Sequence, residues 1–434
     1  MRLILVGDAP GIVQLLRHVY AGSVVALVGA AIRPQYLPEL EEIAAKLGVP
    51  LLIQPKWSSG GYAGFVGAIE ALQADLLWVN SYSMILRDDM LASVRLGGLN
   101  IHAALLPRNR GCNPIQWAII RGELETGVTL HEISPGIDEG PIVDQRKVPI
   151  NVEDSWLALR DRIVCATDDL IASNLPQILS GCWSAVPQDS ARASFGRRRT
   201  PEDGKFDWSM PVIAIHDQIR ALLPLLPPAF YVDHDGRRVL MTEQLTPHAV
   251  TALKFGEPGG GVMQSERVRL RPLRHADAPL LYEWIAGREL VVLNSAFHPV
   301  SEADHEAWVA SMMTKRADLV IFVIEERSTA TTIGTCQLLN INWRQRSAEL
   351  QIRIGDTTCR GRGLGTEAVR LLCEFGFADL NLHRIYLHVF ETNARAIGAY
   401  ENAGFTREGL LRHAAHIDGQ WVDVVPMGLI REYE

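Results

Sequence analysis

The stretch LNIHAALLPRNRG, residues 99–111, decides the fold of the first half of the chain. Its opening residues have the apolar pattern of a buried strand, yet Asn100 and His102 lie two residues apart, which places both side chains on one face of that strand. Pro107 and Gly111 then end the strand and begin a loop. We therefore expect a strand that carries an amide and an imidazole to its carboxyl end, where both need polar partners.

Strand-like and helical segments alternate on both sides of this stretch. RLILVG (2–7) and VVALVGA (24–30) have the pattern of strands, and YLPELEEIAAKLG (36–48) has that of a helix. The alternation continues to about Ile150 and favours a parallel sheet covered by helices. Open sheets of this kind bind ligands at the carboxyl ends of their strands, which is where the two polar side chains are expected.

Length and composition exclude several classes of protein. The 434 residues suffice for two or three domains, and 47% hydrophobic with 21% charged residues indicates a globular protein. The net charge of −8 gives no support for binding nucleic acid, and the six cysteines lack zinc-ligand spacing, so no metal is expected. The N-terminal run lacks the features of a signal peptide, and no segment approaches the ~20 apolar residues of a membrane span. These observations predict a cytoplasmic protein with no membrane partner.

The organisation of the chain changes in its middle. A helical pattern over 155–179 is followed by a small appendix, whose pattern up to about Leu245 is mostly that of strands. Gly and Pro then cluster in KFGEPGGGVMQSE, the best candidate for a linker. We expect a first domain, its appendix, the linker and a second domain at residues 1–190, 191–253, 254–266 and 267–434.

A third polar residue, Asp138, lies in a Gly- and Pro-rich turn after the strand-like run TGVTLHEI. Acyl transfer to an amine needs a base for the amine proton, a donor to the developing oxyanion, and a group that orients the base. His102 can accept a proton near pH 7, the Asn100 amide can donate to an oxyanion, and the Asp138 carboxylate can stabilise the charged imidazole. The alternative is that two hydrogen-bonded core residues and a turn former serve the structure only.

These residues belong to a longer series of motifs. Asn100-x-His102, LLPRNRG, NPIQWAI, GELETGVTLH and IDEGPI together resemble the signature of the N10-formyltetrahydrofolate-dependent formyltransferases, the family of methionyl-tRNA formyltransferase and the nucleotide-sugar N-formyltransferases. The resemblance covers about residues 1–245, and RRRTPEDGKFDW is similar to the sugar-acting members. It implies a Rossmann-like domain in which Asn100, His102 and Asp138 are the catalytic residues.

The same resemblance implies where the donor, N10-formyltetrahydrofolate, binds. It is expected against the backbone of two loops, 81–86 and 136–142. Ala104 and Asn109 depart from the family pattern, in which serine and an aromatic residue are usual, and both are expected in the loop beside the acceptor. The residues expected to hold the donor are Tyr82, Met84, Leu86, Ile137 and Gly140.

A second motif, CRGRGLGTEAV at 359–369, places glycines directly after the strand-like SAELQIRIG and before a predicted helix. Backbone N–H groups and the positive end of a helix suit such a turn to a pyrophosphate, and glycine lets the backbone approach the ligand. A short glycine-rich turn alone is a weak signal, because a tight connection between strand and helix produces the same pattern.

Together with HVFETNARAIGAYENAGF, this turn resembles the GNAT N-acetyltransferases, from residue 268 to the end of the chain. The resemblance implies acetyl-CoA as the donor, contact of Asn393 with the CoA arm, and protonation of the departing thiolate by Tyr400. Glu349 stands where some GNAT enzymes have a catalytic carboxylate, and a structural salt bridge is the alternative for it. The residues expected to hold acetyl-CoA are Ile352, Ile354, Arg360, Gly361, Arg362, Gly363, Leu364, Gly365, Thr366 and Asn393.

The fold class expected is therefore α/β: a Rossmann-like formyltransferase domain with a small mostly-β appendix, followed by a GNAT α/β domain. The expected function is a bifunctional enzyme that formylates and acetylates the amine of a nucleotide-linked sugar. FHPVSEADHEAW and LNLHRIYLHVFETNARAI resemble the acetyltransferase of pseudaminic acid synthesis, which implies a UDP-linked 4-amino-4,6-dideoxy sugar as the small-molecule partner. The arginines at 197–199 are candidates for binding its diphosphate. The resemblance leaves a homodimer open.

Two other functions fit the same motifs. One is a methionyl-tRNA formyltransferase fused to a protein N-terminal acetyltransferase, although an acidic chain disfavours tRNA binding. The other makes the second domain a catalytically silent module that binds CoA or a sugar. The joint presence of Asn393, Tyr400 and the glycine turn favours an active enzyme over the silent module.

Overall fold

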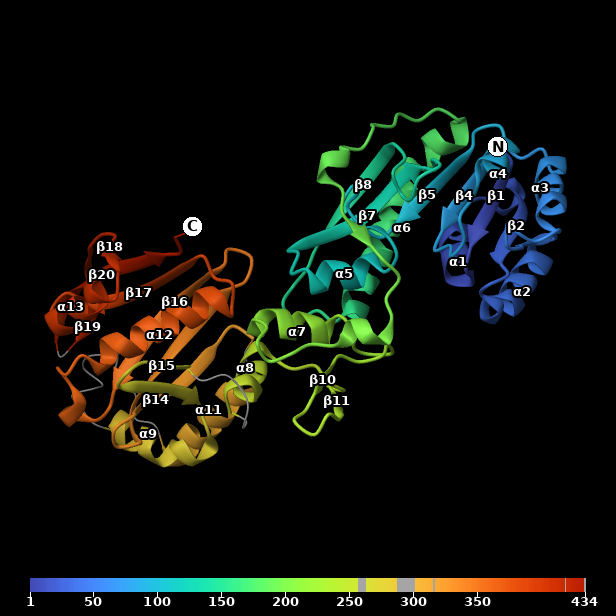
Figure 1. The fold of residues 1–434 in the computed structure, drawn as a ribbon. Helices are drawn as coiled ribbons and strands as arrows, with labels where there is room; N and C mark the ends of the chain where they lie inside the picture. The colour runs from blue at the N-terminus through green and yellow to red at the C-terminus, as the bar shows by residue number, and fades with distance from the viewer. Residues whose placement is uncertain (257–262, 287–300, 315–316, 418, 433–434) are drawn as a thin grey trace. The chain divides into compact units, whose positions relative to one another are not determined.

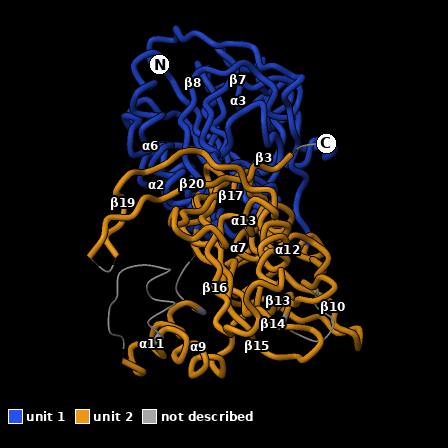
Figure 2. Tube along the Cα trace, turned by 90° about the vertical axis from the view of Figure 1, so that its left-hand side faces the viewer, with its two compact units in different colours: residues 1–150, 154–200 blue, residues 151–153, 201–434 orange. Residues whose placement is uncertain are grey.

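The computed structural model describes residues 1–256, 263–286, 301–314, 317–417 and 419–432. The chain divides into two compact units, which Figure 2 shows in different colours. Residues 1–150 and 154–200 form the first unit, and residues 151–153 and 201–434 form the second. The division lies earlier in the chain than the expected linker, because most of the appendix belongs to the second unit.

The first unit is built on a seven-stranded sheet in the order β3-β2-β1-β4-β5-β7-β8 (Figure 1). The five strands from β3 to β5 are parallel, as expected. β7 and β8 are antiparallel, because only the short loop 133–141 joins them and a parallel pair needs a long crossover. The expectation of a parallel sheet is thus wrong for β7, which is antiparallel to both of its neighbours. The strands are β1 (Leu3–Gly7), β2 (Val24–Ala30), β3 (Leu51–Gln54), β4 (Leu76–Asn80), β5 (Gly98–His102), β7 (Glu125–Glu132) and β8 (Ile142–Pro149).

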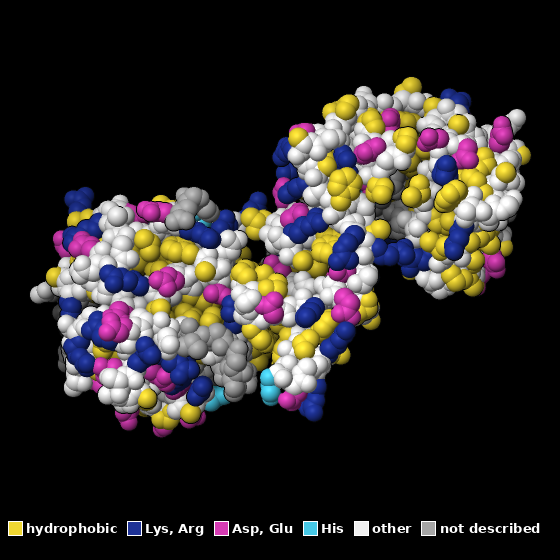
Figure 3. Space-filling view, viewed as in Figure 1, with side chains coloured by type: hydrophobic (Ala, Val, Ile, Leu, Met, Phe, Trp, Pro, Cys, Tyr) yellow, Lys and Arg dark blue, Asp and Glu magenta, His cyan; other side chains and the backbone are white. Residues whose placement is uncertain are grey.

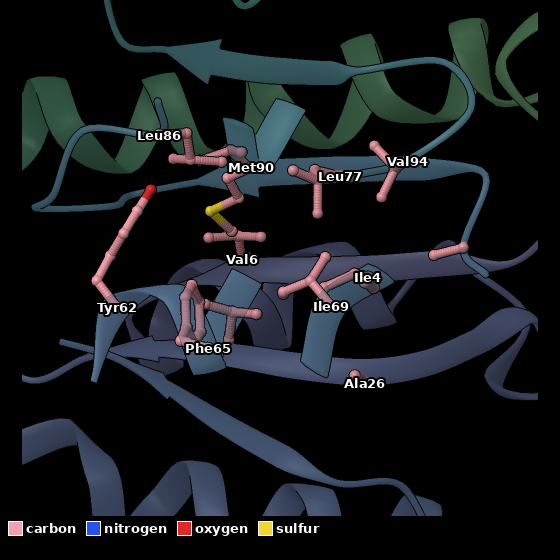
Figure 4. Packing of buried hydrophobic residues seen from close by; sticks show 13 residues of the cluster. Ile4, Val6, Ala26, Tyr62, Phe65, Ile69, Leu77, Leu86, Met90 and Val94 are labelled. Atoms are coloured by element: carbon pink, nitrogen blue, oxygen red, sulfur yellow. The ribbon is translucent and has the colours of Figure 1, made fainter. Parts of the chain in front are cut away.

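Apolar side chains from strands and helices form the core beside this sheet. Val6 and Leu77 of neighbouring strands pack with Phe65, Ile69 and Met90 from two helices (Figure 4). Burying one such side chain fully is worth roughly 1.5–3 kcal/mol, so this cluster fixes β1 and β4, and with them the adjacent strand β5. The helices are α1 (Ala9–Leu16), α2 (Leu37–Leu47), α3 (Tyr62–Ala71), α4 (Asp88–Ala92), α5 (Pro114–Ile120) and α6 (Trp156–Ser180), and the short strands β6 (Arg110–Gly111) and β9 (Phe195–Gly196) pair with each other.

The expectation of a mostly-β appendix is wrong. Two helices lie between residue 201 and the end of α8, beside two strands of three residues each. The β-branched run VIAI favours a strand, but Val212, Ile215 and Ile219 lie at helical spacing and are buried together. The elements are α7 (Val212–Arg220), β10 (Phe230–Val232), β11 (Arg238–Leu240) and α8 (Pro247–Gly256).

A nine-stranded sheet forms the centre of the second unit, in the order β12-β13-β14-β15-β16-β17-β20-β18, with β19 beside β20. β16 and β17 are the parallel pair of this sheet; they pair only over Ser347–Glu349 and Arg384–Tyr386 and then separate. Their separation leaves backbone groups of both strands available to a ligand. The elements are β12 (Met263–Gln264), β13 (Val268–Pro272), α9 (Ala278–Ala286), α11 (Glu302–Thr314), β14 (Val320–Glu326), β15 (Thr331–Asn342), β16 (Ser347–Ile354), α12 (Leu364–Ala378), β17 (Arg384–Phe390), α13 (Ala394–Asn402), β18 (Thr406–Arg407), β19 (Leu411–Ile417) and β20 (Gln420–Ile430).

The expected linker, 254–266, is partly regular structure. Residues 254–256 end α8, 263–264 form β12, and 257–262 lie outside the described residues. Helix α8 extends into the expected linker, where Lys254 is 7% exposed and has an internal partner. The boundaries of independently folding domains stay predictions.

Asp379, the residue that follows α12, joins the appendix to the rest of the second unit. Lys254 Nζ lies 2.6 Å from Asp379 Oδ1, and the two side chains are 8% and 17% exposed. The N–H of Val212 donates to Asp379 Oδ1 at 3.2 Å, and that of Ile213 donates to the Asp379 carbonyl at 3.0 Å. Asp379 therefore caps α7 and neutralises the buried ammonium of α8 at the same time.

Replacing Asp379 by alanine should destabilise the second unit by about 3 kcal/mol, because it leaves a buried ammonium without its counter-charge and α7 without its cap. Urea unfolding of the full chain measures the loss, and hydrogen exchange of the amides in α7 and α8 locates it. The exposed pair Arg238–Glu202, with side chains 54% and 62% exposed, provides the control. Glu202→Ala should cost less than about 1 kcal/mol, and equal losses in the two variants would contradict this role of Asp379.

The surface mixes charges of both signs. Lys and Arg side chains lie among Asp and Glu on the face of each unit that Figure 3 shows, in keeping with a net charge of −8. Within the described parts of the chain, every helix is too short or too polar to cross a membrane. Nor do those parts bring three or more His, Cys, Asp or Glu side chains together where they could hold a metal ion.

Candidate active sites

The structure brings together the three polar residues that the sequence singles out in the first unit. Asn100 and His102 lie on β5, and Asp138 lies in the loop between β7 and β8. Asn100 Nδ2 is 3.4 Å from Asp138 Oδ1, and His102 Nδ1 is 3.5 Å from Asp138 Oδ2. An amide, an imidazole and a carboxylate thus converge at the carboxyl end of β5.

Asp138 is held in place from several sides and is ionised. Its carboxylate accepts a hydrogen bond from the N–H of Gly111 at 2.8 Å, and its carbonyl accepts one from Gln188 Nε2 at 2.8 Å. These contacts support its left-handed backbone, with φ of 51°. Burial alone would raise the pKa of Asp138, but the neighbouring His102 and His131 and the Gly111 N–H lower it to about 2.

His102 is a buried neutral base. Its Nε2 lies 2.8 Å from the carbonyl oxygen of Asn109, which can only accept, so Nε2 carries the proton and Nδ1 has a free lone pair toward Asp138. Burial lowers the pKa of His102 more than the Asp138 charge raises it. The imidazole is therefore unprotonated near neutral pH, and a proton taken up at Nδ1 would face a carboxylate.

His131 is a residue of this site that sequence reasoning missed. It lies on β7 opposite Asn100, and its Nδ1 donates to the Glu132 carbonyl at 2.8 Å. Its Nε2 is therefore an acceptor, and Asn100 Nδ2 donates to it at 3.1 Å. His131 thereby fixes the orientation of the Asn100 amide, with its NH2 group toward His131. The run TGVTLHEI contained the signal, but only the pairing register of β5 and β7 shows that His131 faces Asn100.

The two residues that depart from the formyltransferase pattern lie in the loop after β5, and both are internal. Ala104 is fully buried and Asn109 is 1% exposed. The Asn109 amide donates to Glu123 Oε1 at 2.8 Å and accepts from Arg121, while its carbonyl accepts from His102. Asn109 therefore acts on the position and tautomer of the imidazole.

Each of the two loops expected to hold the formyl donor exposes an apolar side chain. Ile85 and Ile137 are 68% and 56% exposed, whereas Leu86 is packed in the core. Tyr82 is half-buried and donates its hydroxyl hydrogen to Gln54 Oε1 at 2.8 Å. Exposed apolar side chains of this kind suit contact with the flat ring system of a folate. Ile85 was missed, since nothing in the run SYSMIL distinguishes it from Leu86.

The remaining loop residues of the expected folate site have different environments. Met84 is half-buried. Gly140 packs so closely that a Cβ there would lie 1.8 Å from the Glu132 carbonyl oxygen, and its own carbonyl accepts from Gln188 at 2.7 Å. Gly140 thus closes the loop that carries Asp138, and Gln188 secures both ends of that loop.

The second unit contains a cavity of about 830 Å³ where β16 and β17 separate. Helices α12 and α13 border it together with the turn before α12 and part of β19. The cavity brings together most of the residues expected to hold acetyl-CoA and both residues expected to act in catalysis. Those that line it are Glu349, Ile352, Ile354, Arg360, Gly361, Gly363, Gly365, Thr366, Asn393 and Tyr400.

The glycine-rich turn before α12 presents a row of free donors. None of the six N–H groups from Gly361 to Thr366 donates to a backbone carbonyl within the described residues. Gly361 and Gly363 have φ of 72° and 81°, and a Cβ on Gly361 would project into open space. A row of unbonded N–H groups at the positive end of a fifteen-residue helix fits the pyrophosphate of CoA.

Three residues of the expected CoA site are constrained by other contacts. Arg362 is turned toward Glu326, with Nη2 2.5 Å from Oε1, and Leu364 is 1% exposed, so neither side chain lines the cavity. Arg362 and Leu364 can therefore contact the ligand only through their backbone groups. Asn393 accepts from the Ala396 N–H at 3.2 Å and caps α13, which leaves its Nδ2 for a ligand.

Tyr400 lies in this cavity on α13, and its ring packs against Phe405 with centroids 6.0 Å apart. Its hydroxyl forms no hydrogen bond with the residues that the structure describes. Burial raises the pKa of Tyr400 to about 12, so the phenol keeps its proton. A protonated hydroxyl without a partner in the CoA cavity is placed to give a proton to a leaving sulfur.

Glu349 has a neighbour that the sequence did not indicate. His388, on β17, places Nδ1 3.5 Å from Glu349 Oε1, and both side chains line the cavity. Asn340 Nδ2 donates to the other oxygen, Glu349 Oε2, at 3.0 Å. The carboxylate is thus oriented from β15 and paired with an imidazole from β17, which is the composition of a general base. The sequence around His388 does not indicate its pairing with Glu349, because β16 and β17 are distant in sequence.

Two parts of the chain match known families. Residues 20–175 match the family described as formyl transferase, and residues 267–406 match the family described as acetyltransferase (GNAT) domain. The first match includes Asn100, His102 and Asp138. A formyltransferase domain implies formyltetrahydrofolate as donor, and a GNAT domain implies acetyl-CoA.

Two curated relatives resemble the first part of the chain. Methionyl-tRNA formyltransferase of Anaeromyxobacter dehalogenans is 36% identical over 222 residues, which are 51% of this chain and 69% of the relative. Methionyl-tRNA formyltransferase of a Synechococcus species is 35% identical over 262 residues, 58% of this chain and 79% of the relative.

Solved structures resemble each part separately. A sugar N-formyltransferase from Shewanella sp. FDAARGOS_354 is 21% identical, with a TM-score of 0.47 over 56% of this chain and 97% of that one. Spermidine N-acetyltransferase from Vibrio cholerae, in complex with CoA and spermine, is 29% identical, with a TM-score of 0.36 over 38% of this chain and 96% of that one.

Proposed function

The chain belongs to the formyltransferase family and also carries a GNAT acetyltransferase domain, and we propose that each domain acylates the amine of a nucleotide-linked sugar. The acceptor is a UDP-linked 4-amino-4,6-dideoxy sugar of the kind that leads to a pseudaminic-acid-type surface glycan. One observation carries the formyl-transfer half: a neutral imidazole and an oriented amide each lie within 3.5 Å of one ionised carboxylate. The acetyl-transfer half rests on Tyr400 and Glu349 in one cavity with six free N–H groups.

Formyl transfer follows from the protonation states in the first unit. Bound N10-formyltetrahydrofolate supplies the formyl carbon that the amine attacks. His102 takes up the amine proton at Nδ1, and the Asp138 carboxylate stabilises the imidazolium that forms. The imidazolium then gives this proton to the departing nitrogen of the donor as the bond between that nitrogen and the formyl carbon breaks. The Asn100 amide exchanges its long contact to Asp138, 3.4 Å, for the oxygen of the reacting carbonyl, where negative charge develops.

Acetyl transfer uses the polarity of the second cavity. Bound acetyl-CoA supplies the acetyl group as a thioester. Glu349, with His388 beside it, takes the proton of the attacking amine. Tyr400 Oη gives its proton to the sulfur as the carbon–sulfur bond breaks, so that a neutral thiol leaves. This division of roles needs a neutral tyrosine, which the raised pKa of Tyr400 ensures.

A cluster of arginines around Trp117 supports a nucleotide-linked acceptor for formyl transfer. The guanidinium carbons of Arg121, Arg197 and Arg199 lie 5.4, 5.9 and 5.7 Å from the centre of the Trp117 ring. Trp117 is itself anchored, because its Nε1 donates to the Arg197 carbonyl at 2.9 Å. Several guanidinium groups around one aromatic ring can bind a diphosphate and stack on a base.

This cluster is connected to Asp138 through two short strands. A Cβ on Gly196 would lie 2.5 Å from the Trp117 ring, so β9 passes directly beneath the tryptophan. Gly196 pairs with Gly111 of β6, and the N–H of Gly111 donates to Asp138. Two short paired strands therefore connect the arginine cluster to the Asp138 carboxylate.

Replacing both Arg197 and Arg199 by alanine should raise the KM for the nucleotide-linked sugar by roughly 10- to 100-fold with little change in kcat, because charge-assisted hydrogen bonds to a phosphate are lost. Steady-state formyl transfer measures both constants. Arg160 lies over Trp156 at 5.5 Å in the same way, but pairs with exposed Asp161, so Arg160→Ala is the matched control and should leave KM unchanged. A loss of kcat at unchanged KM would contradict a role of these arginines in binding the diphosphate.

Initiator methionyl-tRNA is the second candidate acceptor, because both curated relatives are methionyl-tRNA formyltransferases. The net charge of −8 favours the smaller acceptor. Formyl transfer to the UDP-linked amino sugar and to methionyl-tRNA, measured side by side at the same donor concentration, decides between them. Formylated sugar supports the proposal; formyl-methionyl-tRNA without any formylated sugar overturns it.

A further inference from the structure

Arg353, on β16, is a cation without a counter-charge among the residues that the structure describes. Its Nε is buried and has no hydrogen-bond partner there, and burial is what lowers the pKa of its guanidinium. Arg271, on the same sheet, is paired with both Asp277 and Glu325. Withdrawing a guanidinium from water without an anion is costly, so Arg353 is suited to an anionic ligand.

Arg353 lines two cavities at once. One is the acetyl-CoA cavity, and the other, of about 210 Å³, lies against the sheet beside helices α9 and α11. Figure 1 shows these two helices next to β14 and β15. Gln351 and Arg353 are common to both cavities, and Trp284 and Trp308 provide apolar surface in the smaller one. A ligand in the smaller cavity therefore lies within reach of the donor along β16.

The alternation of β16 places the base and the cation on one face of the sheet. Glu349, Gln351 and Arg353 alternate with Leu350, which is 1% exposed, so all three point away from it. Gln351 pairs across the sheet with Gln337, whose Nε2 donates to it at 2.9 Å. Four residues of strand separate Glu349 and Arg353 by about 13 Å at the backbone.

His305 is the titratable neighbour of Arg353 on the helix side. It is 2% exposed and its ring stacks on Trp308 with centroids 5.5 Å apart. Burial, together with the charge of Arg353, lowers the pKa of His305, so it stays neutral beside the guanidinium. The smaller cavity thus offers one positive charge, an amide pair and aromatic walls.

We propose that Arg353 binds the diphosphate of the acetyl acceptor and so selects an anionic amine substrate whose nitrogen reaches Glu349. The inference rests on the proposed function, because it assigns the acceptor side of the same acetyl-transfer site. Trp284 and Trp308 contact the apolar part of that acceptor, and Gln351 contacts the sugar between its two ends. Arg353 also borders the acetyl-CoA cavity, but it lies on the face of β16 that carries Glu349, so we assign it to the acceptor as a specificity-determining residue.

Kinetics of the full chain with the UDP-linked amino sugar test this assignment. Arg353→Gln should raise the KM for the acceptor by about 10- to 100-fold while the KM for acetyl-CoA changes by less than about twofold. Arg353→Lys should give an intermediate KM, because it keeps the charge and loses the fork of donors. Arg269, exposed on β13 and outside both cavities, supplies the matched control, and Arg269→Gln should leave both KM values unchanged.

The outcomes separate this inference from the proposed function. If the wild type acetylates the sugar but Arg353→Gln keeps its acceptor KM, or raises the KM for acetyl-CoA instead, the role of Arg353 is wrong and the function stands. If the wild type does not acetylate the sugar, calorimetric titration with inorganic pyrophosphate in the presence of CoA decides whether Arg353 binds an anion. Weaker binding to Arg353→Gln than to the wild type and Arg269→Gln then supports the anion site; equal binding overturns it.

Discussion

Replacing His102 by asparagine should lower kcat/KM for formyl transfer by about 10²- to 10⁴-fold, because the base that receives the amine proton is lost. Asparagine is close to imidazole in size and keeps a donor toward the Asn109 carbonyl, which His102 contacts at 2.8 Å. Binding of the folate should change little, since its expected contacts come from loops 81–86 and 136–142. Steady-state kinetics and equilibrium binding of the folate measure the two effects.

His18 provides the control for this substitution. It is a second histidine of the first unit that contacts an aspartate, with Nε2 3.0 Å from Asp168 Oδ1. His18→Asn should leave formyl transfer within about twofold of the wild type, since His18 is remote from the reacting groups. Unchanged formyl transfer in His102→Asn would remove the triad from the mechanism.

The pH profile of the wild type gives an independent check on His102. The base acts in its neutral form, and burial lowers its pKa below 6.5, the usual value for histidine. The neutral form therefore persists to lower pH than for a solvated imidazole. The acid limb of kcat/KM should lie below pH 6.5, and a limb above that value would mean that burial does not dominate.

Replacing Tyr400 by phenylalanine should slow acetyl transfer by about 10²-fold and leave formyl transfer unchanged. The substitution removes one hydroxyl and keeps the ring that packs against Phe405, so the fold of α13 is retained. The loss should appear in kcat, because the proton is needed only as the thiolate departs. Rates of thiol release from acetyl-CoA in the presence of acceptor provide the measurement.

Tyr231 is a matched position for this test. It lies in the appendix, packed with its ring against Phe206 and Trp208, outside the CoA cavity. Tyr231→Phe should leave acetyl transfer unchanged. A Tyr400→Phe variant with normal kcat would show that another group or water protonates the sulfur.

Much of the formyl-transfer site is visible in the sequence because its spacing is local. Asn100 and His102 are two residues apart on one strand, and Asp138 stands alone in a turn between two strand-like runs. Their convergence follows from the rule that ligands bind at the carboxyl ends of parallel strands. What supports them is set by pairing register, which the hydrophobic pattern does not reveal: His131 faces Asn100 only because β7 is antiparallel to β5.

In the second unit, too, some residues of the candidate site can be found from the sequence and others cannot. The turn from Arg360 to Thr366 could be placed at the start of a helix from its glycines, and the structure puts the turn on a cavity. His388 and Arg353 gave no signal, because their significance depends on which side chains surround them across the sheet. Helix α7 was missed for a different reason: its β-branched residues favour a strand, and its cap, Asp379, comes from a distant part of the chain.

Mass spectrometry of the UDP-linked 4-amino-4,6-dideoxy sugar, after incubation with each donor in turn, tests most directly that one chain carries two independent centres for acylating this amine. The wild type should add one formyl group with N10-formyltetrahydrofolate and one acetyl group with acetyl-CoA. His102→Asn should lose only the formyl product, and Tyr400→Phe only the acetyl product. An unmodified sugar with both donors, under conditions where the same preparation formylates methionyl-tRNA, would contradict the account.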